Sequence, residues 1–306
     1  DYVMLIDPAP VVPATDALVI SEVMSKPAGG ESDEYLELYN SGATAIDLAG
    51  FRFPQGEPFD EFVFGDVTIG PGEYLLVVHN LAAFRSRYGD SLDTIVAGEW
   101  ISGSLSNSGE VITLLDAEGT VVISFEYSDL PPWPTSPDTD GTSLVLINPV
   151  AGNPTIGSDW TASSLVGGTP GGAELSPGFA AWMAARGEFN PLATKPGEPV
   201  SNLLSYAFGL DLAGGDSAVA LPRLGELTIG SESFITYAYR RRVSDPALGY
   251  TVELSRDGLS WVDGSADLVS VEVADEGDGT ERVTVRSKDP PGSERIVLLR
   301  VRVTPP

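Results

Sequence analysis

Turn signals recur at intervals of about ten residues along this chain, and this spacing limits its fold more than any other feature. The 306 residues include 34 Gly and 24 Pro, which interrupt helices and central strands. Between them lie short apolar segments such as residues 18–24, 74–80 and 120–127. Many short strands joined by turns predict a mainly β protein built from β-sandwiches.

Alternation along the first segments predicts how individual strands lie. In residues 33–40, Leu36 and Leu38 point to one face and Glu37 to the other, which predicts a half-buried strand. Residues 46–53 are expected to form one further strand. The hairpin around Gly119 is expected to place one row of apolar side chains on a single face, namely Val121, Ile123, Phe125 and Tyr127. Leu81–Tyr88 is the one helix expected in this half of the chain.

A Gly- and Pro-rich stretch at residues 167–178 marks a boundary, because it suits neither a helix nor a central strand. Residues 1–172 carry a formal charge of −21 and residues 173–306 a charge of −6, which supports two separate domains. The predicted organisation is an N-terminal extension (1–15), an immunoglobulin-like β domain (16–172), a linker with two short helices (173–215) and a small C-terminal β-sandwich (216–306). The expected C-terminal strands are residues 234–241, 250–255, 269–273, 281–286 and 296–303, and the expected helices are residues 179–186 and 200–208.

Composition excludes several classes of function. The absence of Cys excludes disulfides, thiol catalysis and Cys-ligated zinc. The net charge of −27 argues against nucleic-acid binding, which depends on Lys and Arg neutralising phosphates. No stretch of 18 apolar residues is present that would span a membrane. His79 is the only His, and no Ser lies in a Gly-x-Ser-x-Gly turn, so we expect no enzyme. The many carboxylates are interpreted as solvated groups that favour solubility.

Calcium is the one ion for which the sequence offers candidate ligands, although no cofactor is expected to be required. Asp138 and Asp140 lie on one loop beside Gly141, and clustered carboxylates on flexible loops suit this ion. Two further acidic clusters, residues 31–34 and 275–278, match no complete calcium loop. Ordinary Asp-Gly turns and solvated edges explain the same residues.

Aromatic side chains give the second candidate site. Trp133 lies in a Pro-Pro-Trp-Pro loop, and with Tyr127 it is the predicted ligand-binding pair, because exposed aromatic rings stack on sugars. The alternative is that Trp133 folds over the end of the core. Arg240, Arg241 and Arg242 form the only basic run, interpreted either as protection of a sheet edge or as a contact for an anionic polysaccharide.

The segments LVISEVM, DEYLELYNSGATAIDLAGFRF and LSNSGEVITLLDAEGTVV occur in an order and spacing that resemble the bacterial lamin tail domain, over roughly residues 16–172. This resemblance implies an immunoglobulin-like β-sandwich used for interaction and not for catalysis. Residues 177–306 resemble the C-terminal region of large secreted proteins of verrucomicrobial-type bacteria, through PVSNLLSYAFGLD and a terminal LLRVRVTPP. That family places an Asp-rich calcium loop before the Ser-Asn-Leu-Leu segment, but residues 190–199 here lack the Asp ladder.

These observations lead to one expected function and one alternative. We expect a non-catalytic adhesion or interaction module, extracellular or at the cell surface, that forms the C-terminal part of a larger secreted bacterial protein. Its partner is expected to be a protein or a cell-surface polysaccharide. The alternative is a carbohydrate-binding accessory domain of a secreted enzyme. The sequence leaves the oligomeric state open.

Overall fold

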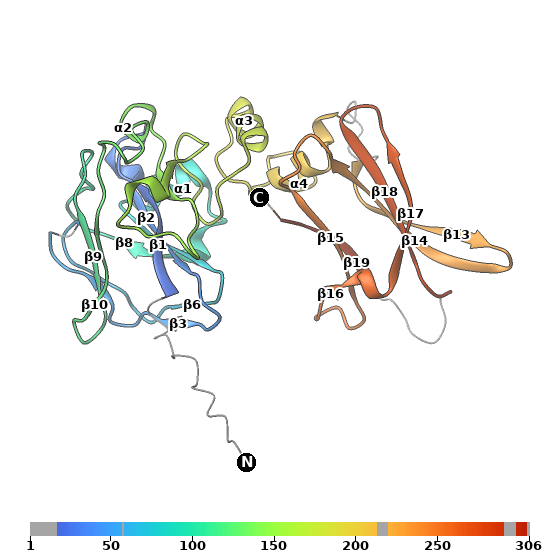
Figure 1. Cartoon of the computed structure of the whole chain (residues 1–306), viewed down its shortest axis with the longest axis horizontal. Coiled ribbons are helices and arrows are strands. Elements are labelled where there is room, and N and C mark those ends of the chain that lie inside the picture. Colours follow the sequence, from blue (N-terminus) through green and yellow to red (C-terminus); the bar gives the residue numbers. More distant parts are fainter. Residues whose placement is uncertain (1–16, 57, 213–219, 291–297, 305–306) are drawn as a thin grey trace, which may run out of the picture. The chain divides into compact units, whose positions relative to one another are not determined.

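The computed structural model describes residues 17–56, 58–212, 220–290 and 298–304. The chain divides into two compact units, Asp1–Glu174 (unit 1) and Leu175–Pro306 (unit 2), and both consist mainly of β-strands (Figure 1). Across the described residues, no helix has the length and apolar character needed to cross a membrane.

Unit 1 is a β-sandwich of the immunoglobulin-like type that the sequence predicts. Its larger sheet runs in the order β12 (Trp160–Ala162), β11 (Leu144–Leu146), β1 (Leu18–Met24), β2 (Tyr35–Asn40), β7 (Tyr74–Val78) and β8 (Val96–Glu99). The second sheet runs in the order β10 (Val121–Glu126), β9 (Val111–Leu115), β4 (Arg52–Phe53) and β5 (Phe62–Val63), and β3 (Ile46–Asp47) pairs with β6 (Thr68–Ile69). Only β7 and β8 pair in parallel among these ladders. The apolar faces of the sheets enclose one core that includes Ile20, Leu36, Phe53, Ile112 and Phe125.

The expected single strand at residues 46–53 is wrong in detail, because the chain turns within it. The amide of Phe51 donates to the Leu48 carbonyl at 2.9 Å. Gly50 has a φ of +78°, a left-handed conformation that glycine adopts without a steric penalty. The turn separates β3 from β4 and lets them join different sheets.

Strand β2 is buried on both faces, which corrects the expectation of a half-buried strand. It lies between β1 and β7, and the helix α1 (Leu81–Tyr88) covers its second face. Phe84 and Tyr88 pack edge-on against Tyr35, with ring centroids 5.9 and 6.0 Å away. Glu37, expected to face solvent, is 1% exposed. The helix itself was predicted correctly, and the Asn80 side chain caps it by accepting from the Ala83 amide at 2.9 Å.

The row of side chains predicted on β10 is interrupted at its first member. Ile123, Phe125 and Tyr127 are buried, but Val121 is 58% exposed. A β-bulge between Val121 and Ile123 shifts the register against β9, and such an extra residue reverses the alternation of the strand.

Unit 2 is a second, smaller β-sandwich. One sheet has the order β13 (Arg223–Ile229), β14 (Glu232–Arg242), β18 (Thr280–Ser287), β17 (Leu268–Asp275), and the other has the order β16 (Val262–Asp263), β15 (Gly249–Ser255), β19 (Leu298–Thr304). The helices α3 (Pro177–Arg186) and α4 (Asn202–Ala207) precede the strands, as predicted. Tyr237, Tyr239 and Val283 centre its core. Five of these strands were predicted, whereas β13 and β16 were missed.

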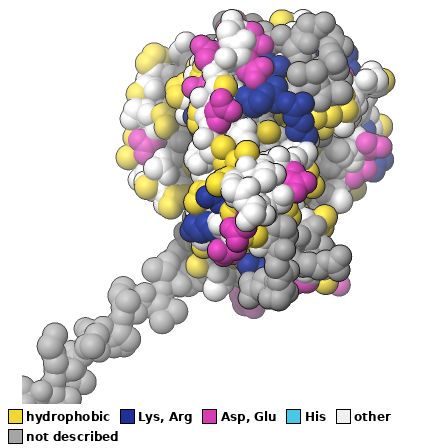
Figure 2. Space-filling view, turned by 90° about the vertical axis from the view of Figure 1, so that its right-hand side faces the viewer, with side chains coloured by type: hydrophobic (Ala, Val, Ile, Leu, Met, Phe, Trp, Pro, Cys, Tyr) yellow, Lys and Arg dark blue, Asp and Glu magenta, His cyan; other side chains and the backbone are white. Residues whose placement is uncertain are grey.

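The basic run does not protect a sheet edge, because β14 lies between β13 and β18. Each of its guanidinium groups instead pairs with its own carboxylate: Arg240 with Asp278 at 2.5 Å, Arg241 with Glu281 at 2.8 Å and Arg242 with Asp211 at 2.7 Å. In the space-filling view, basic side chains likewise lie close to acidic ones (Figure 2). The run therefore stabilises unit 2 internally.

Candidate functional site

Trp133 and Tyr127, the predicted ligand-binding residues, both lie in the core of unit 1. Trp133 is 9% exposed, and its ring packs against Trp160 with centroids 5.6 Å apart. Gly157 lies so close that an added Cβ would meet the indole at 2.7 Å. A ring enclosed in this way has no free face for a sugar, so the structure places Trp133 over the core.

Tyr127 is 2% exposed and organises a loop from inside the sandwich. Its hydroxyl donates to the Ser106 carbonyl at 2.7 Å and to Glu110 Oε1 at 3.0 Å. Burial raises the pKa of Tyr127 far above its usual value, so the phenol stays protonated. The side chain therefore holds the loop before β9 and does not face a ligand.

The proposed calcium ligands lie in and around a short helix, α2 (Pro137–Asp140). The Lys26 ammonium lies 2.5 Å from Asp138 Oδ1. This ion pair uses the carboxylate oxygen that a calcium ion would need. Asp140 Oδ1 accepts from the Thr139 hydroxyl at 2.9 Å. The described residues bring together no group of three His, Asp or Glu side chains suited to a metal ion.

The only histidine of the chain lies at the end of β7. His79 Nδ1 is 2.6 Å from the Glu31 carbonyl and 3.7 Å from Glu34 Oε2, and its ring stacks on Trp100 at 5.2 Å. Glu34 is fully buried, and its Oε2 accepts from the Leu105 amide at 2.9 Å, while Oε1 has no hydrogen-bond partner among the residues that the structure describes. Burial raises the pKa of Glu34 to about 8. Glu34 therefore holds the loop at Leu105 through its hydrogen bond. The imidazole of His79 contacts a carbonyl, a carboxylate and an indole ring, and none of these is a nucleophile that it could activate.

Sequence reasoning missed the buried carboxylates of unit 1, Glu22, Glu34 and Glu37, which it interpreted as solvated. Each accepts backbone amide hydrogens from a loop: Thr169 donates to Glu22, Leu105 to Glu34 and Gly171 to Glu37. For Glu22 and Glu37 the available signal was their position inside apolar strand segments, Ser-Glu-Val-Met and Tyr-Leu-Glu-Leu-Tyr.

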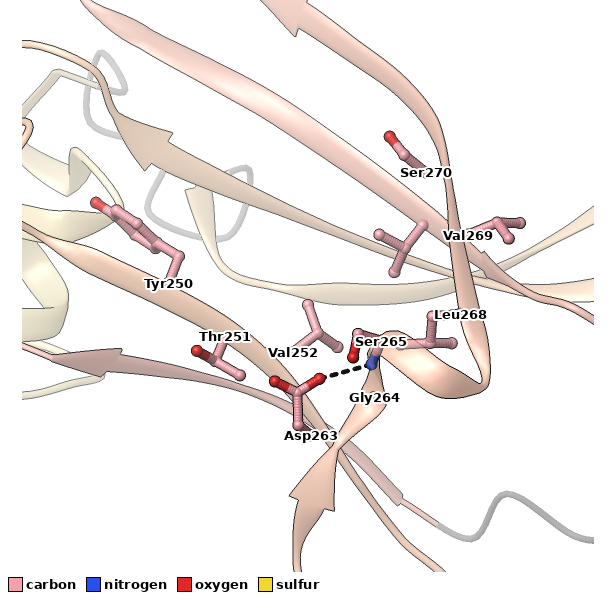
Figure 3. Close-up of a pocket in the computed structure, with 10 residues that line it drawn as sticks. Tyr250, Thr251, Val252, Asp263, Gly264, Ser265, Leu268, Val269 and Ser270 are labelled. Atoms are coloured by element: carbon pink, nitrogen blue, oxygen red, sulfur yellow. Dashed lines mark hydrogen bonds between the residues drawn. The ribbon is translucent and has the colours of Figure 1, made fainter.

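A cavity of about 250 Å³ opens between the two sheets of unit 2 (Figure 3). Strand β15 forms one wall and strands β17 and β18 form the other. A short 3-10 helix, Gly264–Ala266, closes one end. The apolar lining consists of Val252, Leu268, Val269 and Val285, and the polar lining of Tyr250, Thr251, Asp263, Ser265 and Ser270.

The titratable groups of this cavity are committed to structural hydrogen bonds. Hydrogen bonds from Ser265 hold the pKa of Asp263 below its usual value, and its Oδ1 accepts from the Ser265 amide at 2.7 Å (Figure 3). The Tyr250 hydroxyl donates to the Ala207 carbonyl at 2.9 Å. Lys288 lies beside Ser265, but its ammonium donates to the carbonyls of Ser265 and Ala266 at 3.5 and 2.5 Å, so activation of a serine hydroxyl as a nucleophile is not supported. The cavity is suited to apolar contact.

Residues 12–129 match the family model of the lamin tail domain. This family has an immunoglobulin-like fold and is typically non-enzymatic, in agreement with the sandwich of unit 1. No curated protein matches the chain. The family match ends within unit 1, so the resemblance of the C-terminal region to secreted verrucomicrobial-type proteins stays a prediction.

Proposed function

We propose that the chain is a non-catalytic interaction module, the C-terminal part of a larger secreted or surface-attached protein, and that it binds a protein partner. The observation that carries this proposal is the exposure of β13. Leu224 is 65% and Ile229 47% exposed, and no residue of the strand is buried. Figure 1 shows the hairpin of β13 and β14 projecting from the rest of unit 2.

A free strand edge offers backbone donors and acceptors to another chain. β13 pairs only with β14 among the described strands, so its other edge is open along seven residues. Strand addition at such an edge is a recurring mode of peptide recognition, in which exposed side chains give specificity. The partner that fits is an extended segment with apolar side chains spaced to meet Leu224 and Ile229.

A second copy of the chain fits this edge less well. In a symmetric antiparallel pairing centred on β13, Glu226 would face Glu226 of the other copy. Like charges directly opposite each other destabilise a sheet. A heterologous partner avoids this repulsion, particularly if it places Lys or Arg opposite Glu226.

Binding of the labelled chain to the surface of the producing cells tests the proposal. The test variant is Leu224→Lys, because a lysine on an edge strand discourages pairing with other strands. The matched control is Leu259→Lys, since Leu259 is 87% exposed in unit 2 but lies outside β13. We expect Leu224→Lys to reduce binding at least about tenfold, the equivalent of about 1.4 kcal/mol, and Leu259→Lys to retain it.

Three outcomes would overturn the proposal: equal binding by both variants, binding that survives proteolytic removal of surface proteins and is lost with surface polysaccharide, or substrate turnover by the purified chain. The second outcome would favour the polysaccharide alternative, for which the buried Trp133 gives no support.

A further inference from the structure

Two buried carboxylates face each other in the larger sheet of unit 1. Glu22 in β1 and Glu37 in β2 are directly opposite in the antiparallel register, so their side chains leave the sheet on the same face. Each residue is 1% exposed. Neither has an ion-pair partner among the described residues. The pair thus lies in the interior without a neutralising cation.

The segment 163–174, which ends unit 1, lies on this pair and is held by it. The Thr169 amide donates to Glu22 Oε1 at 2.9 Å, and the Gly171 amide donates to Glu37 Oε2 at 2.6 Å. The Gly167 carbonyl accepts from the Tyr88 hydroxyl at 2.5 Å. An added Cβ at Gly168 would meet Glu22 Oε1 at 2.2 Å, so the backbone fits closely over the carboxylate.

The remaining contacts of the pair come from neutral hydroxyl groups. Glu22 Oε1 also accepts from the Tyr35 hydroxyl at 2.7 Å and from the Ser143 hydroxyl, and Glu37 Oε1 accepts from the Ser21 hydroxyl at 2.7 Å. Glu22 Oε2 is buried, and no described residue forms a hydrogen bond with it. These contacts support one negative charge in the pair, but a second charge would be shielded from solvent with no cation paired to it among the described residues.

The elements packed around the pair bring few compensating charges to it. The titratable groups that interact with the pair are Tyr35 from β2, Tyr74 from β7, Tyr88 from α1, and Glu174. Next to these tyrosines lie Tyr39, Arg87 and Asp33. The one cation among them, Arg87, is directed to Asp33 at 3.4 Å and to the Val166 carbonyl at 3.3 Å. Burial raises the pKa of Glu22 to about 7 and raises the pKa of Glu37 well above its usual value, and the charge of Glu22 raises the pKa of Glu37 as well.

We propose that Glu22 and Glu37 form a proton-dependent latch, which holds the 163–174 segment against the sheet while the pair keeps a proton and releases it when that proton is lost. Release admits water to both carboxylates and relieves their repulsion. It also frees the chain immediately before unit 2, which begins at Leu175, and so lengthens the connection between the units. The latch is therefore a built-in response to rising pH.

Proton linkage determines how strongly the opening of the latch depends on pH. Because the closed state binds one proton more than the open state, the opening equilibrium rises about tenfold for each pH unit between the pKa of the open and the closed pair. Hydrogen exchange at the Thr169 and Gly171 amides of the full chain reports this opening. Protection factors, corrected for the intrinsic pH dependence of exchange, are expected to fall by about tenfold per pH unit above neutrality.

Amides of β2 such as Leu36 serve as the internal reference, because they exchange only through larger unfolding. Protection factors at Thr169 and Gly171 that equal those of β2 at every pH would indicate that the 163–174 segment opens only by general unfolding of unit 1, and would overturn the latch. Protection of Thr169 and Gly171 that does not change with pH would overturn it as well.

The test variant is Glu37→Gln, which keeps the shape of a protonated carboxyl. It is expected to keep the segment protected at alkaline pH and to remove most of the local pH dependence. The matched control is Glu34→Gln, which neutralises another buried carboxylate of unit 1 and should leave the pH dependence of exchange at Thr169 intact.

A titration of the side-chain carboxyl carbons in the wild-type chain by NMR needs no variant. If Glu22 and Glu37 both ionise near the usual pKa, the proposal is wrong.

Discussion

Replacement of Glu34 by Gln should remove a large part of the pH dependence of the stability of unit 1. Glu34 is fully buried, and its pKa of about 8 lies well above the value of 4.5 that it takes when solvated. The folded state therefore binds more protons than the unfolded state between these two values. Stability is fully present below about pH 4.5 and is lost as the pH rises towards 8.

The size of this loss follows from the same two values. At 1.36 kcal/mol per pKa unit, ionisation of Glu34 lowers the free energy of unfolding by about 3 kcal/mol between pH 5 and pH 8. Glu34→Gln lacks this ionisation. At pH 5 the two proteins should differ by about 1 kcal/mol or less, because the glutamine can still accept from the Leu105 amide.

Urea unfolding followed by hydrogen-exchange mass spectrometry of peptides from β2 and β7 measures unit 1 separately from unit 2, which a single spectroscopic transition would not do. The wild type should lose about 3 kcal/mol more than the variant between the two pH values. Parallel pH profiles for the two proteins, or a wild type that gains stability towards pH 8, would refute the assignment of a protonated Glu34 in the folded state.

Two further substitutions test the packing of each unit. Trp133→Ala should lower the free energy of unfolding of unit 1 by about 3–5 kcal/mol, because it empties the space beside Trp160; a loss below about 1 kcal/mol in urea unfolding would mean that the ring is not core. In unit 2, Arg240→Met should cost about 2 kcal/mol, since Arg240 is 2% exposed and bonded to Asp278 and Thr280. The neighbouring Arg241→Met should cost less than about 1 kcal/mol, since its side chain is 40% exposed, and equal costs for the two in thermal unfolding would contradict this distinction.

Local pattern was sufficient for the elements whose partners lie close in sequence. The helix at Leu81–Tyr88 follows from its Asn80 cap, and the hairpin of β9 and β10 follows from the turn at Gly119. Strand β13 was missed because its sequence has no strong alternation of apolar and polar residues. Its extended conformation is stabilised by pairing with β14 along seven residues. Such pairing is a tertiary effect that propensity does not contain.

The buried carboxylates show where pattern reasoning fails for a physical reason. Alternation correctly puts Glu37 on the face of β2 opposite Leu36 and Leu38. It cannot indicate that α1 and the 163–174 segment cover that face, because this covering depends on contacts between residues distant in sequence, such as Phe84 with Tyr35 and Gly171 with Glu37. A polar residue at an outward position was therefore assigned to solvent, although its hydrogen bonds are internal.

The same contacts define where the first domain ends. The family match stops at residue 129, yet Glu22 accepts hydrogen bonds from Ser143 and Thr169, and Glu37 accepts one from Gly171. Strand β11 also completes the hydrogen-bonding of β1 on the side away from β2. A chain that ended at residue 129 would lack β11, which pairs with β1, and the core side chains Leu144, Leu146 and Trp160. The folded domain must therefore include the segment up to Glu174, and the carboxylates that appear to be surface charges in the sequence are what bind that segment to the sheet.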